Sequence, residues 1–240
     1  MTFRSMFAAG AAALGLLGLA SEAAAGVVYS QAGDGQACSP QCWTSDIGSA
    51  DNYGFQTFDN FTLSKSAGIT TVSWQGFYYD YVNLANDPVA PVTNNWQIQF
   101  YGDSAGLPGA LLYTTTETAA QVTTTLLDQD TPFLAAANVY EFTAVLPTAF
   151  AASAGTPYWF SPLSLQTDFN PFFSWSAAAS QPSGAYSAQL FEGALSAVSG
   201  DRAFTLSSVP EPAAWSLMLV SFAGMGAALR VRRGRLAAAV

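Results

Sequence analysis

The side chains able to do acid–base or nucleophilic chemistry are few and of one kind. The chain has no histidine and a single lysine, Lys65. Schemes that pair a serine or cysteine nucleophile with a histidine base are therefore excluded. Catalysis would have to use carboxylates, as in glycosidases, where two acids stand roughly 5 to 9.5 Å apart. Asp59, Asp80, Glu141 and Asp168 are candidates, but any acidic domain of this size offers such a choice, so we expect no enzyme.

Two cysteines, Cys38 and Cys42, stand in the sequence Cys-Ser-Pro-Gln-Cys. In an oxidising compartment outside the cytoplasm we expect them to form a disulfide. Closing so short a loop stabilises the fold by only about 2 kcal/mol, so the bond pins a local turn. Zinc lacks its usual four ligands here. The oxygen-rich stretches 46–52 and 128–130 do not match a calcium loop, so we expect no metal and no cofactor.

Aromatic side chains are the other group that could recognise a ligand, because they stack on sugar rings when exposed. Trp74, Trp96 and Trp159 fall on alternating positions of predicted strands, which favours a place in the core. Three further aromatic residues lie beside predicted loops and are candidate glycan contacts: Trp43, Tyr79 and Tyr81.

The elements that position these side chains are predicted to be strands. Aromatic and β-branched residues alternate with polar ones, as in Val72, Trp74, Gly76 and Tyr78, a period typical of half-buried strands. Residues 102–109 are a strong turn signal. Only 149–154 suggests a brief helix outside the two ends of the chain. The predicted strands are 26–31, 53–62, 72–78, 96–101, 111–116, 122–127, 139–146, 157–165, 172–176, 186–191 and 203–206.

This pattern predicts an all-β fold, an antiparallel β-sandwich that is jelly-roll-like, between an N-terminal signal helix and a C-terminal transmembrane helix. The domains are expected to be 1–25, 26–208 and 209–240. The first is a signal peptide: Arg4 precedes an apolar stretch, and Ala23 and Ala25 form a small-x-small cleavage site. A retained signal anchor is the alternative.

The last thirty residues combine a motif, an apolar run and a basic end. Pro210-Glu211-Pro212 is held extended by its prolines. Residues 213–229 carry no charge and give roughly 25 Å of helix, near the short limit for a membrane span. Beyond them lie four arginines, which cost roughly 2.5 to 3.5 kcal/mol each to insert and so are expected to stay cytoplasmic: Arg230, Arg232, Arg233 and Arg235.

These residues resemble the PEP-CTERM sorting signal of Gram-negative bacteria in its PEPxxWxxM variant, with Trp215 and Met218 at the matching places. The likeness covers about 27 of the 240 residues. It implies recognition by an exosortase-type membrane protease, passage through the inner membrane with the C-terminus cytoplasmic, and delivery to the cell surface or exopolysaccharide matrix. A permanent membrane anchor is the alternative, since its insertion is physically identical.

The net charge of the expected exported domain limits the classes of molecule that it can bind. Between Gly26 and Ser208 lie two basic residues, Lys65 and Arg202, and every acid of the chain except Glu22 and Glu211, for a net charge of −12. Nucleic acid is excluded as a main partner, because binding it requires clustered Lys and Arg. We therefore expect a non-enzymatic exported protein that has structural or glycan-binding work, with exopolysaccharide a candidate partner. The alternatives are a carboxylate-dependent glycan hydrolase and a membrane-anchored adhesin.

Overall fold

The described part of the chain consists almost entirely of β-strands. The computed structural model describes residues 26–33, 35–38, 42–47, 54–80, 94–133, 135–166, 171–180 and 186–209, without the side chains of 129–136. Residues Ala25–Val209 form one compact unit. Its strands are β1 (Gly26–Gln31), β2 (Trp43–Thr44), β3 (Phe55–Thr62), β4 (Ala67–Tyr79), β5 (Trp96–Ser104), β6 (Leu107–Glu117), β7 (Val122–Phe133), β8 (Ala135–Ala152), β9 (Pro157–Ser164), β10 (Phe172–Trp175), β11 (Tyr186–Phe191), β12 (Ala194–Ser199) and β13 (Phe204–Ser208).

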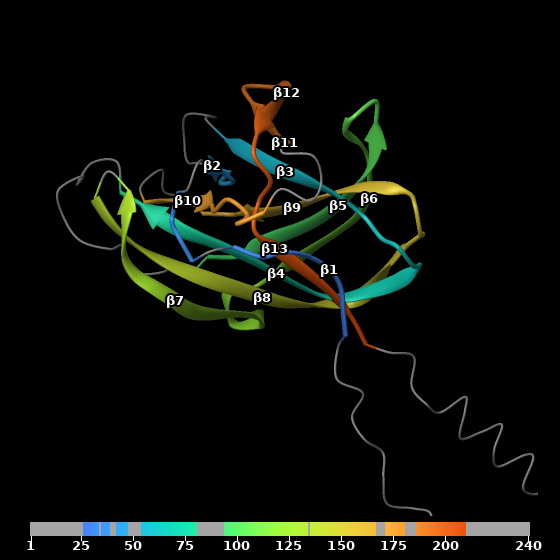
Figure 1. Ribbon diagram of the computed structural model, residues 1–240, viewed down its shortest axis with the longest axis horizontal. Helices are drawn as coiled ribbons and strands as arrows, with labels where there is room; N and C mark the ends of the chain where they lie inside the picture. Colours follow the sequence, from blue (N-terminus) through green and yellow to red (C-terminus); the bar gives the residue numbers. More distant parts are fainter. Residues whose placement is uncertain are drawn as a thin grey trace, which may run out of the picture. The chain divides into compact units, whose positions relative to one another are not determined.

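The strands form two antiparallel sheets that face each other (Figure 1). The six-stranded sheet has the order β12-β11-β3-β9-β5-β6. In the seven-stranded sheet, β4 is central: β8 pairs with one edge of it, while β13 and then β10 share the other. β1 lies beyond β13, β2 beyond β10, and β7 beyond β8. The predicted all-β, two-sheet antiparallel architecture is confirmed.

Aromatic rings fill most of the space between the sheets. Trp74 of the seven-stranded sheet meets Trp96 of the six-stranded sheet with ring centroids 4.9 Å apart. Phe160 and Trp175 meet across the same space at 5.6 Å. Truncating one such ring to alanine costs about 3 to 5 kcal/mol, so this layer is the main source of stability. The predicted core positions of Trp74 and Trp96 are confirmed, whereas the equally buried Trp159 belongs to a separate cluster with Phe58 and Ala188.

Backbone conformation explains two of the hairpins. Ala105 and Gly106 between β5 and β6 both have positive φ, of 54° and 81°, and so do Glu192 and Gly193 between β11 and β12, of 48° and 77°. Two such residues in succession form the two-residue turn whose twist matches that of antiparallel strands. The predicted turn around 102–109 therefore closes within two residues.

Several sequence predictions of local structure need correction. The brief helix suggested at 149–154 is wrong, because Phe150, Ala151 and Ala152 pair with Ile69, Gly68 and Ala67 in β4. β2 and β12 were not predicted: β2 has two residues, and the alanine- and serine-rich β12 has little apolar alternation.

The predicted signal peptide (1–25) and the tail from Pro210 onward lie outside the described residues. Among the residues that are described, no helix is both long and apolar enough to span a membrane.

Candidate functional site

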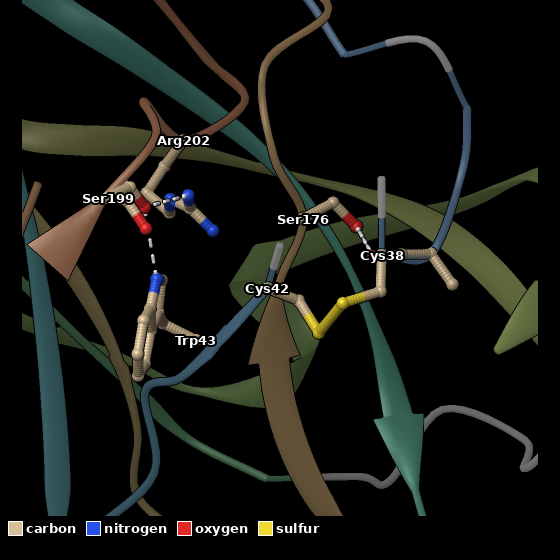
Figure 2. The surroundings of a disulfide bond; sticks show 7 residues. Cys38, Cys42, Trp43, Ser176, Ser199 and Arg202 are labelled. Atoms are coloured by element: carbon tan, nitrogen blue, oxygen red, sulfur yellow. Dashed lines mark hydrogen bonds between the residues drawn. A yellow bond between two sulfur atoms is a disulfide. The ribbon is translucent and has the colours of Figure 1, made fainter. Parts of the chain in front are cut away.

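Trp43, a candidate glycan contact, links the two sheets at one edge of the sandwich. It pairs in register with Trp175 of β10. Its indole nitrogen donates to the carbonyl oxygen of Ser199 at the end of β12, at 3.2 Å. Arg202 donates to the same carbonyl from Nη2 at 3.1 Å, as Figure 2 shows. The indole is half-buried, and these contacts fix its position.

The disulfide and Tyr79, another candidate contact, lie on the outer face of the seven-stranded sheet. The predicted Cys38–Cys42 bond is confirmed (Figure 2). Both cysteines and Tyr79 pack around a small apolar cluster that includes Phe77. The ring of Tyr79 also meets that of Phe172, edge to face at 5.3 Å.

The three candidate glycan contacts do not form a single described surface. Tyr79 pairs with Phe172, and Trp43 pairs with Trp175, three residues further along β10. Because side chains alternate along a strand, Tyr79 and Trp43 lie on opposite faces of the sheet. Tyr81 lies outside the described residues. A glycan contact at these residues stays a prediction.

Asp59 is a buried structural carboxylate. It faces the interior from β3 and accepts hydrogen bonds from the backbone N–H groups of Asn60, at 2.7 Å, and of Arg202. Burial raises the pKa of this carboxyl well above its usual value, and the neighbouring Asp201 adds to the rise. Glu141 pairs in register with Gln75 and lies on the outer face of the other sheet. The structure therefore does not bring Asp59 and Glu141 together, and Asp168 lies outside the described residues.

A second buried carboxylate, Asp46, belongs to a hydrogen-bonded chain. It accepts from the hydroxyl of Ser164 at 2.9 Å and from the backbone N–H of Phe173 at 3.1 Å. Asn94 donates to Ser164, and the hydroxyl of Tyr78 donates to Asn94. Burial, followed by the charge of Asp46, raises the pKa of Tyr78 above its usual range. Among the described residues, no group of three or more histidine, cysteine or acidic side chains could hold a metal ion.

An uncharged polar cluster, which we call the amide cluster, lies on the outer face of the six-stranded sheet. Its members are Gln56, Gln99, Tyr101 and Ser161, from β3, β5 and β9. Nε2 of Gln56 lies 2.6 Å from Oε1 of Gln99, 3.0 Å from Oγ of Ser161 and 3.2 Å from the hydroxyl of Tyr101. The hydroxyl of Ser161 donates its proton to the carbonyl of Thr57. It therefore accepts, and does not donate, in its hydrogen bond with Gln56.

The amide cluster offers both hydrogen-bond donors and hydrogen-bond acceptors. Gln99 is buried, yet the structure records no partner for its Nε2 among the described residues. Thr114 and Thr116 of β6 are exposed opposite Gln99 and Gln97. Burial raises the pKa of Tyr101, so its hydroxyl is neutral. The sequence indicates this face by alternation along β5, where Gln97, Gln99 and Tyr101 alternate with the buried Trp96, Ile98 and Phe100. The hydrogen bond between Gln99 and Gln56 could not be predicted from that pattern.

The two ends of the described domain meet. Gly26 of β1 pairs with Ser208 of β13. The next residue, Val209, donates its backbone N–H to Oγ1 of Thr70 at 3.0 Å. The first residue of the motif, Pro210, follows directly.

Comparisons with known proteins give no relative from which a function could be transferred. No protein-family model, no curated protein and no solved structure matches the chain.

Proposed function

We propose that this chain is an exported, non-enzymatic protein of the cell surface or exopolysaccharide matrix, sorted through its C-terminal PEP-CTERM signal by an exosortase-type protease. The observation that carries the proposal is the match between sequence and domain limits. The compact unit runs from Ala25 to Val209, the expected signal cleavage follows Ala25, and the expected sorting motif begins at Pro210.

Processing at both points would leave the domain complete. β1 begins at Gly26 and β13 ends at Ser208, and these two residues pair with each other. Neither cut would remove a strand or expose the aromatic layer. This supports a route in which the signal helix and the transmembrane helix act only during export, and the jelly-roll-like sandwich is the delivered part.

A carboxylate-dependent hydrolase has less support as an alternative. Its best-placed interior acid, Asp59, is fully buried and accepts two backbone hydrogen bonds. Glu141 faces the opposite side of the other sheet, so the two acids cannot flank one sugar as glycosidases require. The burial and hydrogen bonds of Asp59 favour a structural role for that carboxylate.

Binding of a neutral glycan is a second candidate function, favoured by the amide cluster. Amide and hydroxyl groups with free donors and acceptors match the hydroxyls of sugars, and the half-exposed ring of Tyr101 offers an apolar face. The cluster contains no ionisable carboxylate, while the domain as a whole carries −12. An uncharged polysaccharide is therefore the ligand class that fits it.

Mass spectrometry of the protein from cell fractions tests the sorting proposal. We expect surface or matrix protein to begin at Gly26 and to lack Arg235, and Glu211→Ala to leave a longer form in the membrane. The conservative control Ala214→Gly should be processed normally. Surface protein that retains Arg235 would contradict processing.

A glycan array tests the second function on the processed protein. We expect binding to neutral polysaccharides to be lost with Gln56→Ala and kept with Thr123→Val, an exposed position on the other sheet. Equal binding by both variants would exclude the amide cluster as the site.

A further inference from the structure

The acids of the domain are absent from one region of the seven-stranded sheet. None of residues 26–33, 60–79, 142–166 and 203–209 is aspartate or glutamate. These residues include β1, β4, β13 and the second half of β8, which are neighbours in the sheet. Lys65, one of the two basic residues of the domain, is exposed in the turn just before β4. A domain with a net charge of −12 thus has one patch without carboxylates, which ends at Glu141 on the same outer face.

Strand register defines the face that this region presents, which we call the tail-proximal face. Val27, Ser207, Thr71 and Val145 stand in one row across β1, β13, β4 and β8. The next row on the same face is Ser30, Thr205, Ser73 and Thr143. Both rows are uncharged, and Val27 and Val145 are 64% and 67% exposed. The face therefore combines hydroxyls with exposed apolar side chains.

The chain leaves the domain beside this face. Val209, 48% exposed, is bonded to Thr70 at the start of β4. Only Pro210, Glu211 and Pro212 separate it from the apolar run that begins at Ala213. At no more than about 3.6 Å a residue, Ala213 lies within about 18 Å of Ser208. A membrane that held the apolar run would be close to the domain.

We propose that the tail-proximal face lies against the lipid surface while the chain is held by its tail. The inference rests on the proposed membrane insertion of 213–229. Charges interact over a Debye length of about 8 Å at physiological salt, so anionic headgroups repel any carboxylate brought to the surface. The two acid-free rows, with the exposed Val27 and Val145, meet the headgroups without this repulsion. They fit an anionic lipid surface better than any face rich in carboxylates.

Site-specific photo-crosslinking of the full chain tests this arrangement. The chain is reconstituted into vesicles of phosphatidylethanolamine and phosphatidylglycerol, with benzoylphenylalanine in place of Val145 or, as the control, of Thr116. Both positions are exposed, but Thr116 lies on β6 of the other sheet. After flotation and illumination, lipid adducts are measured by mass spectrometry. We expect at least a several-fold excess of lipid adduct at 145 over 116.

The outcomes separate this inference from the proposed function. Flotation with equal adducts at the two positions, or with none, overturns the inference but leaves membrane insertion intact. Crosslinks from 145 to a second copy of the chain also overturn it, because the face is then a contact between copies. A chain that does not float with the vesicles refutes insertion of the tail and the inference together.

Discussion

Replacing Arg202 by methionine tests how much one buried cation contributes to the unfolding free energy of the domain. Arg202 is 0% exposed. Its guanidinium donates to the carbonyl of Ser199 and, from Nε at 3.2 Å and Nη2 at 2.8 Å, to that of Gly200. Burial lowers its pKa to about 10, while the charges of Asp59 and Asp201 oppose that shift. The side chain is therefore charged at neutral pH and surrounded by acceptors.

The expected loss follows from what the substitution leaves behind. Methionine fills much of the volume but leaves two carbonyls and two buried acids without their cation. Removing one partner of a buried charged group costs about 3 to 5 kcal/mol of unfolding free energy. For a domain of this size, each kcal/mol corresponds to about 2 to 4 °C, so the melting temperature should fall by about 6 to 20 °C.

Urea unfolding of the fragment 26–209, with the disulfide intact, measures the effect. Lys65→Met is the matched control, because it removes the same charge from an exposed position, where substitutions change stability by about 0.5 kcal/mol or less. Adding Asp59→Asn to Arg202→Met should restore part of the loss. A loss below about 1 kcal/mol for Arg202→Met, or equal losses for Arg202→Met and Lys65→Met, would refute this account of the buried charge.

Three further predictions concern single contacts. The pKa of Asp59 is raised in the folded state, so the folded domain binds this proton more tightly than the unfolded chain does. The group therefore favours folding at low pH and loses that contribution as pH rises through the folded pKa. Asp59→Asn should flatten the fall in unfolding free energy above about pH 4, and an unchanged pH profile would contradict this. Replacing Cys38 and Cys42 by serine should cost about 2 kcal/mol or less and leave the far-ultraviolet spectrum unchanged; loss of the fold would show that the bond does more than pin a turn. Trp43→Phe should lower the unfolding free energy by about 1 to 3 kcal/mol, because the carbonyl of Ser199 loses one donor. Chemical denaturation measures this loss, and a variant as stable as the wild type would show that the bond contributes nothing.

The strands that could be predicted are those whose own sequence shows the alternation of apolar and polar residues. Val72 and Trp74 alternate with Ser73 and Gln75, and both face the aromatic core. The period of two indicates the core side in this part of β4, whereas the buried Phe77 lies on the opposite face. By contrast, 149–154 is small and alanine-rich, and only its pairing with the first residues of β4 makes it a strand.

The contacts that determine the candidate sites are too distant in sequence to be predicted in this way. Trp43 and Ser199 are 156 residues apart, and Asp59 and Arg202 are 143 apart. Asp59 shares its face of β3 with Phe61, so alternation alone could not reveal that a backbone N–H far along the chain would satisfy it. Gln56 likewise meets Gln99 only because β9 brings β3 and β5 within reach.

The pairing of β1 with β13 imposes an order on folding. Among the described strands β1 pairs only with β13, the last one, and Gln31 is 173 residues from its partner Phe204. If the chain crosses a membrane from its N-terminus, the sheet can close only once residues 204–208 are through. Completion of the domain would then coincide with the arrival of the tail, so a chain stalled before that point would still expose Tyr29, whose ring packs on Phe61 and Phe204.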